Sequence, residues 1–186
     1  YRAKTAIIAS GKISRELGVP GEETFLHKGL TYCATCDGPI FTGKDVAVVG
    51  GGNSALDAAL QMIRIARHVY LININPKLGG DDIMREKLEN SNVVTVMNSA
   101  KITEIIGDKM VSAILVKKED KEELLAVQGV FVEIGLIPNS KFAKDVEKNN
   151  RGEIKINGKN ETSVPGIFAA GDVTDVPYKQ ISVSVG

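Results

Sequence analysis

The chain has 186 residues, of which 43% are hydrophobic and 25% charged, close to the average for soluble globular proteins. Basic and acidic side chains balance at 23 each. The chain therefore lacks the excess of positive charge that is typical of proteins that bind nucleic acids or acidic membranes. No apolar run approaches the roughly 20 residues that span a bilayer, and the first residues lack the features of a signal peptide. Two cysteines are too few to cross-link a secreted scaffold, so we expect a cytoplasmic protein.

The first half of the chain predicts a βαβ unit. A short apolar strand over residues 5–10 and a crossover segment over residues 12–29, rich in glycine and charge, come first. A β-branched strand over residues 45–49 then leads through a glycine turn into a helix. The apolar residues of that helix recur at helical spacing: Ala55, Leu56, Ala59, Leu60, Ile63 and Ala66. A second strand follows over residues 68–74, and we expect the two strands to be parallel.

The next segments predict a mixed sheet arrangement. A polar helix over residues 81–90 precedes a third strand over residues 93–97. Residues 101–126 contain three apolar segments separated by turn-forming and charged residues, a pattern typical of an antiparallel meander lying beside the parallel strands. Residues 129–134 predict one more buried strand.

The last third of the chain is predicted less regularly. After Pro138 we expect a polar helical stretch and a turn-rich hairpin around Gly152 and Gly158. Residues 182–186 stop without a polar tail or a helix cap, directly after a segment that looks set to enter a helix, and the first residues begin inside a strand pattern. We therefore expect the chain to be a piece of a longer protein.

Residues 50–55, Gly-Gly-Gly-Asn-Ser-Ala, match the dinucleotide-binding pattern G-x-G-x-x-[GA] directly after a predicted strand and at the start of a helix. Gly50 permits the tight turn, Gly52 lets a pyrophosphate approach the backbone, and the small Ala55 lets helix and strand pack closely. The free amides of the first helical turn then face the phosphates. This pattern predicts dinucleotide binding, and a glycine turn without a ligand is the alternative.

The residues after the second strand bear on which dinucleotide binds. An acid there would bind the ribose diol of NAD, whereas arginines would accept the 2′-phosphate of NADP. The sequence offers neither. Asn73 can hydrogen-bond a diol but has no charge for a phosphate, and the nearby Lys77 is explained equally well as a solvated loop residue. We favour NADH and keep NADPH as the alternative.

Both cysteines lie in one C-x-x-C motif, Cys33 and Cys36, for which three interpretations are open. A zinc site would need two more ligands, and the only histidines, His27 and His68, lack a suitable spacing. A purely structural disulfide would close a short loop and stabilise little. A redox dithiol near a βαβ unit is the interpretation we favour. Asp37 could then transfer the proton that exchange requires, or it could simply begin the turn that follows.

Four segments together resemble the low-molecular-weight thioredoxin reductase family, in that family's order. They are residues 32–38 (YCATCDG), 43–60 (GKDVAVVGGGNSALDAAL), 131–140 (FVEIGLIPNS) and 162–180 (TSVPGIFAAGDVTDVPYKQ). The resemblance covers nearly the whole chain, and parts of it are closer to the flavoprotein reductases of alkyl hydroperoxide systems.

The resemblance implies an α/β fold in which a Rossmann-like three-layer nicotinamide-binding domain, with a parallel sheet and an antiparallel β-meander, spans residues 15–136. Residues 1–14 and 137–186 would be parts of an FAD-binding domain that lacks its first glycine motif here. The implied cofactors are FAD and NADH or NADPH. The implied partner is a thioredoxin-like, glutaredoxin-like or peroxiredoxin-system protein, and the full-length protein would be a homodimer.

Site roles follow from the same resemblance. Cys33 resembles the thiol that attacks the partner's disulfide, Cys36 the thiol nearer the flavin, and Asp37 the acid–base group; we expect Cys33 to be the more exposed cysteine. The cofactor-binding positions are implied to be Gly50, Gly52, Asn53, Ser54, Ala55, Asn73, Ile134 and Gly135 for the nicotinamide nucleotide, and Gly171, Asp172, Lys179 and Gln180 for FAD. The alternative is a non-catalytic NAD(P)-binding module or a flavoprotein with another electron acceptor.

Overall fold

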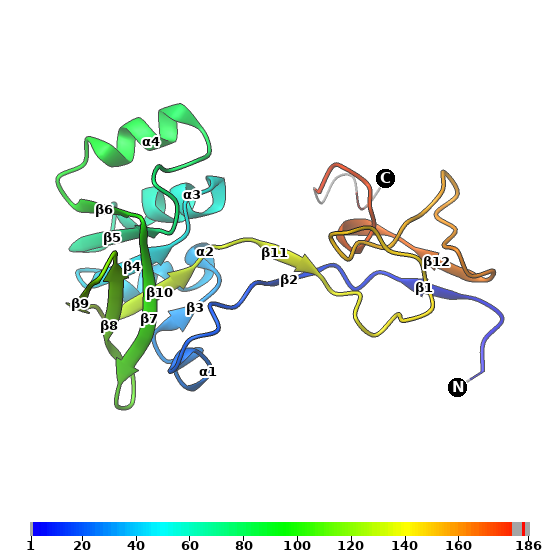
Figure 1. The fold of residues 1–186 in the computed structure, drawn as a ribbon, viewed down its shortest axis with the longest axis horizontal. Coiled ribbons are helices and arrows are strands. Elements are labelled where there is room, and N and C mark those ends of the chain that lie inside the picture. The colour runs from blue at the N-terminus through cyan, green and yellow to red at the C-terminus, as the bar shows by residue number, and fades with distance from the viewer. Residues whose placement is uncertain (1, 180–183, 185–186) are drawn as a thin grey trace. The chain divides into compact units, whose positions relative to one another are not determined.

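A computed structural model describes residues 2–179 and residue 184. The chain divides into two compact units (Figure 1). Residues 15–135 form the larger unit, and residues 1–14 together with residues 136–186 form the smaller one. No helix among the described residues is long and apolar enough to cross a membrane.

The larger unit is built on a five-stranded sheet with the strand order β3-β10-β4-β5-β6. Every neighbouring pair in this sheet is parallel. The strands are β3 (Leu30–Thr31), β10 (Gly129–Val132), β4 (Asp45–Val49), β5 (His68–Asn73) and β6 (Val94–Asn98). The predicted parallel pairing of β4 and β5, and the third strand beside them, are therefore confirmed.

Both faces of this sheet are covered, as the alternation along β4 shows. Val46 and Val48 pack with the helices, whereas Ala47 and Val49 pack with the meander. The helices on the first face are α3 (Asn53–Met62) and α4 (Asp82–Glu89), which lie together in Figure 1. The antiparallel meander on the second face consists of β7 (Ala100–Gly107), β8 (Val111–Lys118) and β9 (Lys121–Ala126). The three-layer α/β prediction is confirmed.

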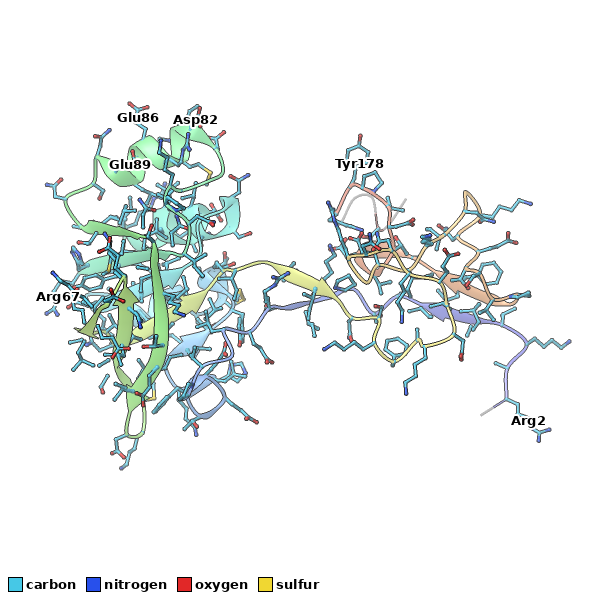
Figure 2. The ribbon with its side chains drawn as sticks, viewed as in Figure 1. Arg2, Arg67, Asp82, Glu86, Glu89 and Tyr178 are labelled. Carbon is cyan, nitrogen blue, oxygen red and sulfur yellow. A yellow bond between two sulfur atoms is a disulfide. The ribbon has the colours of Figure 1, made fainter. Side chains whose placement is uncertain are left out.

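Helix α4 illustrates how sequence sets the ends of an element. The carboxylate of Asp81 accepts hydrogen bonds from the amides of Ile83 and Met84, which would otherwise lack partners in the first turn. Leu88 is fully buried against the sheet, whereas Asp82, Glu86 and Glu89 are exposed, and Asp82 and Glu86 lie on the outer side of the helix (Figure 2). The helix predicted over residues 81–90 from its acidic start is therefore confirmed.

The segment predicted as a crossover over residues 12–29 contains regular structure that the sequence did not reveal. It holds β2 (Lys12–Ser14) and the single-turn helix α1 (Glu22–Phe25). After β3, the C-x-x-C motif forms a second single-turn helix, α2 (Ala34–Asp37), followed by a 3-10 turn over Gly38–Phe41. These elements are too short to show a hydrophobic period.

The smaller unit joins the two ends of the chain. Strand β1 (Ala6–Ile8) pairs in parallel with β12 (Ile167–Ala169), and β2 pairs antiparallel with β11 (Leu136–Pro138). A small core of Val146, Ile154, Ala169 and Val173 holds it together. The two flanks of the larger unit therefore pack together as one unit.

The predicted polar helix after Pro138 is wrong, because residues 139–150 form turns instead. Among these residues, only Val146 contributes a fully buried side chain to the small core, so no apolar helical face exists. Asn149 Oδ1 accepts hydrogen bonds from the amides of Arg151 and Glu153, which favours a turn over a helix. The hairpin expected around Gly152 is present as the antiparallel bridge of Lys148 with Ile154.

Candidate functional site

The predicted site residues of the larger unit lie at the carboxyl edge of the parallel sheet. Because all five strands run the same way, the segments that leave their carboxyl ends meet at one edge. Cys33 follows β3, Gly50 follows β4, Asn73 ends β5 and Glu133 follows β10. The disulfide motif and the glycine turn therefore lie at the same edge of the sheet, with β10 between the strands that carry them.

The glycine turn has the geometry that the sequence pattern predicts. Gly50 has a φ of 139°, and a Cβ atom there would lie 2.3 Å from the carbonyl oxygen of Glu133. Gly52 precedes α3, and a Cβ atom added to it would meet nothing within 4 Å, because the residue faces open space. Ala55 is fully buried beneath the turn. No side chain of the described residues caps the first turn of α3, so its amides are free for an anion.

A cavity of about 1060 Å³ opens at this turn. That volume is at the upper end of the range of small-molecule and cofactor sites, roughly 300–1,000 Å³. Its walls are the glycine turn, the ends of β5 and β10, the loop over residues 15–20 and the start of β7. They carry Arg15, Lys77 and Lys101 against one acid, Glu133, among the described lining residues. This charge balance favours an anionic ligand.

The structure places each predicted residue of the nucleotide site with respect to this cavity. Gly50, Gly52, Asn53, Ser54, Asn73, Ile134 and Gly135 line it, whereas Ala55 packs beneath it. The side chain of Asn53 is turned to the loop before α4, where its Oδ1 accepts the amide of Asp81 at 2.8 Å. Asn53 can therefore offer a ligand its backbone amide while its side chain fixes the loop.

Asn73 is buried and largely committed to the protein. Its Nδ2 donates to Asn98 Oδ1 at 2.8 Å and to the carbonyl oxygen of Asn75 at 3.1 Å, and its Oδ1 accepts the amide of Asn75 at 3.1 Å. An amide side chain has two donors and two acceptor lone pairs. One lone pair of Oδ1 therefore remains, which could accept from a hydroxyl but could not donate to a phosphate.

Cys33 and Cys36 form a disulfide across α2, with their Cα atoms 5.3 Å apart. Cys33 is the N-cap residue of α2, and its Sγ accepts the amide of Cys36 at 3.2 Å. In the reduced protein the same amide would stabilise a thiolate at Cys33. Within the described residues no group of His, Cys, Asp and Glu side chains could hold a metal ion.

Asp37 is connected to Cys33 through one hydroxyl group. The Thr31 hydroxyl donates to Asp37 Oδ2 at 2.5 Å and accepts the amide of Cys33 at 3.2 Å. Thr31 is buried at the end of β3. The carboxylate predicted as a proton carrier is thus held beside the disulfide by a residue that sequence reasoning missed.

The expectation that Cys33 is the more exposed cysteine is wrong. Cys36 is exposed and Cys33 is half-buried. The reason is that Cys33 directly follows the buried strand β3 and caps α2, whereas Cys36 lies a full turn farther out.

Sequence reasoning also missed two acids of the larger unit. Glu22 is buried in α1, and its carboxylate accepts hydrogen bonds from the amides of Leu17 and Gly18 and from the Tyr32 hydroxyl. Through these bonds it connects the cavity wall to Tyr32, the residue before Cys33. Burial raises the pKa of the Tyr32 hydroxyl, and its hydrogen bond to Glu22 raises it further. The second acid, Glu133, could have been noticed because it follows a strand at the sheet edge where ligands bind.

In the smaller unit, Gly171 and Asp172 line a cavity of about 250 Å³ at the carboxyl ends of β1 and β12. This space is below the range for a cofactor-sized ligand, so these residues alone could hold only part of a flavin nucleotide. Lys179 forms an ion pair with Glu153 at 3.2 Å and donates to the carbonyl oxygen of Thr174. Gln180 lies outside the described residues.

Comparisons with known proteins agree with this geometry. The profile of the pyridine nucleotide-disulphide oxidoreductase family matches residues 1–186. The F subunit of alkyl hydroperoxide reductase from Staphylococcus aureus (strain MRSA252) is 47% identical over 189 residues, covering 99% of this chain and 37% of that protein. The corresponding F subunit from Pseudomonas aeruginosa is also 47% identical, covering 100% of this chain and 36% of that protein.

Solved structures give the same result. Thioredoxin reductase of Lactococcus lactis has a TM-score of 0.86 at 33% identity, covering 98% of this chain and 61% of that one. Thioredoxin reductase of T. acidophilum has a TM-score of 0.86 at 40% identity, covering 100% of this chain and 62% of that one. The chain thus spans little more than a third of the length of the curated relatives. It belongs to the pyridine nucleotide-disulphide oxidoreductase family.

Proposed function

We propose that this chain carries the nicotinamide-nucleotide site and the redox disulfide of a thioredoxin reductase-like flavoprotein. The observation that supports this most is that the Cys33–Cys36 disulfide and the free amides of α3 both lie at the carboxyl edge of the same parallel sheet. The disulfide does not line the cavity, but it follows β3 at the sheet edge where the cavity opens, a placement that a purely structural disulfide does not require. A non-catalytic nucleotide-binding module is not favoured, because it would need neither the disulfide nor Asp37.

The electrons balance in two stages. NAD(P)H would give up a hydride, and the disulfide would gain two electrons and two protons to become a dithiol. A flavin would accept the hydride and pass two electrons on, because a disulfide alone does not take a hydride from a nicotinamide. In the second stage a Cys33 thiolate would attack a protein disulfide, and Cys36 would release the reduced partner and restore the Cys33–Cys36 bond.

The assignment of Cys33 as the attacking thiol rests on its environment and not on its exposure. Its sulfur accepts the amide of Cys36, which favours the thiolate form that attacks disulfides. Asp37, held by Thr31, is the proposed proton carrier for the dithiol. Cys36, the exposed cysteine, would then be the one that faces the electron donor.

For the nucleotide we propose NADH. The remaining lone pair of Asn73 can accept from a ribose hydroxyl, whereas a 2′-phosphate would need donors at that position. The partner would be a thioredoxin-like or peroxiredoxin-system protein, as the names of the relatives suggest, and the compartment a reducing one.

Cysteine variants test the proposed function. With Cys36→Ser, the remaining Cys33 should form a stable mixed disulfide with an oxidised thioredoxin, detected by mass spectrometry. Cys33→Ser is the matched control and should trap much less. Trapping through Cys36 alone would overturn the assignment of the attacking thiol, and no trapping by either variant would count against disulfide exchange with a thioredoxin.

A further inference from the structure

Glu133 lies between the two parts of the site, as the sheet register shows. Strand β10 pairs with β3 on one side and with β4 on the other. Phe131 is the partner of Thr31, and Val132 is the partner of Val49. On the β4 side the next residues in register are Glu133 and Gly50, whereas on the β3 side the pairing ends at Thr31, two residues before Cys33. Neighbouring strands lie about 4.8 Å apart, so Glu133 leaves β10 at the same sheet edge as Gly50 and the segment that carries Cys33.

Contacts on both sides agree with this register. On the β4 side, the amide of Glu133 donates to the carbonyl oxygen of Val49 at 2.8 Å, and its own carbonyl oxygen lies against Gly50. On the β3 side, the backbone amide of Ala34, the residue after Cys33, is near enough to the Glu133 carboxyl group to lower its pKa. Glu133 therefore acts on the same turn of α2 that Cys33 caps.

The side chain of Glu133 is on the helical face of the sheet. Along β10, Val130 and Val132 pack on the meander face and Phe131 on the helical face, so the next alternate position, 133, turns to the helices. The residue is half-buried and also lines the nucleotide cavity. Burial raises the pKa of its carboxyl group, the Ala34 amide lowers it, and the negative charge of Asp57 raises it.

We propose that Glu133 is a positioning residue whose negative charge sets the proton affinity of the Cys33 thiol in the reduced protein. The inference rests on the proposed redox function of the disulfide and deepens it. The amide of Cys36 favours a thiolate at Cys33, and a carboxylate at the same helical turn opposes it. Thiolate attack is fastest when the thiol pKa is near the ambient pH. The Cys36 amide lowers the pKa of the Cys33 thiol and the Glu133 carboxylate raises it, so together they can hold it in that range.

The other charged groups near Glu133 do not cancel its effect. α3 presents Asp57, which has the same sign, and α2 carries Asp37, which is bonded to Thr31. Within the described part of the chain, the acids that form ion pairs are Asp45, Asp82, Glu147 and Glu153, and Glu133 is not among them. The cations of the cavity wall are available to a bound nucleotide.

The test is the titration of the thiols in the reduced 186-residue chain, followed by ultraviolet thiolate absorbance and by alkylation of Cys33. Glu133→Gln removes the charge and keeps the shape and an acceptor for Ala34. This variant should lower the pKa of the Cys33 thiol by about one unit, which raises its thiolate fraction near neutral pH by about tenfold. The thiol–disulfide equilibrium with dithiothreitol should shift toward the reduced protein by up to the same factor. Glu133→Asp keeps the charge and should stay close to the wild type.

Glu123→Gln is the matched control, because it removes an equal charge from β9 on the opposite face of the sheet. It should leave the thiol titration unchanged. An unchanged titration in Glu133→Gln, or an equal shift in Glu123→Gln, would overturn the inference. A wild-type disulfide that cannot be reduced and re-formed reversibly would instead overturn the proposed function, and this inference with it.

Discussion

The Thr31 hydroxyl donates a 2.5 Å hydrogen bond to the Asp37 carboxylate and at the same time accepts the amide of Cys33. One buried hydroxyl thus connects the end of β3, the first half of the disulfide and the proposed proton carrier. A valine at this position would have the same shape but would lack both the donor and the acceptor that the Thr31 hydroxyl supplies.

Thr31→Val should destabilise the larger unit by about 1–3 kcal/mol, because it leaves a carboxylate and an amide without their partner. Denaturant unfolding of the oxidised chain measures this free energy. Thr35→Val is the matched control, because Thr35 is exposed and its hydrogen bond to Gln61 is at the surface. That change should cost no more than about 0.5 kcal/mol. Equal effects of the two variants would show that the Thr31 hydroxyl has no special role.

The glycine turn offers a pair of substitutions with opposite expectations for folding. Gly50→Ala puts a Cβ atom 2.3 Å from a backbone oxygen at a φ of 139°, so it should destabilise the chain and abolish nucleotide binding. Gly52→Ala meets no protein atom within 4 Å, so folding should be unchanged. The added methyl group would enter the cavity, and we expect NADH affinity to fall at least about tenfold by calorimetry. Unchanged affinity in Gly52→Ala would place the nucleotide elsewhere.

Lys77 tests the proposed preference for NADH. Lys77→Glu puts a negative charge on the cavity wall, where it would repel a 2′-phosphate more than a ribose hydroxyl. NADPH binding should weaken by about tenfold while NADH binding changes by less than about threefold. Lys109→Glu, an exposed residue outside the cavity lining, makes the same change in net charge as a control. Equal losses for both nucleotides would argue that the 2′ position lies away from Lys77.

The smaller unit should lose stability in acid through Glu153. Burial would raise the pKa of this carboxyl group, but hydrogen bonds from Asn149, Lys179 and Lys12 outweigh it and lower the pKa to about 2. Because the pKa of Glu153 is lower in the folded state, its carboxylate contributes fully to the free energy of unfolding above the ordinary pKa of 4.5. This contribution is lost as the pH falls toward 2. The whole contribution is roughly 3 kcal/mol.

Unfolding measured across this pH window checks the prediction. Glu153→Gln should be less stable at neutral pH, and its stability should fall less steeply on acidification. Glu147→Gln is the control, because the Glu147 ion pair with Lys155 is exposed and should contribute little. A wild-type chain whose stability is flat from neutral pH down to the lowest pH would contradict the account of Glu153.

The sequence was sufficient to predict those helices and strands that a strong local pattern of apolar residues and turns defines. Strand β4 covers the predicted residues, because a β-branched run is bounded by charge on one side and by the glycine turn on the other. Helix α3 and the meander were also predicted, since their apolar periods match their buried faces. The turn geometry of Gly50 follows from the same pattern.

The rest depends on contacts between residues far apart in the chain. Glu133 and Cys33 leave the sheet at the same edge because β10 pairs with β3, 100 residues away, as the pairing of Phe131 with Thr31 shows. The exposure of Cys36 follows from the single-turn helix α2, which is too short to have a period. The helix expected after Pro138 failed because side-chain bonds of Asn149 and Ser140 stabilise turns that composition does not reveal.

The central claim is that nucleotide and disulfide belong to one electron path. It is tested most directly by adding NADH anaerobically to this chain within a flavin-containing protein of its relatives' length, and then alkylating the thiols for mass spectrometry. We predict that Cys33 and Cys36 both become labelled only after NADH is added, with one disulfide reduced for each NADH oxidised. Oxidation of NADH while the disulfide stays intact and unlabelled would contradict the account.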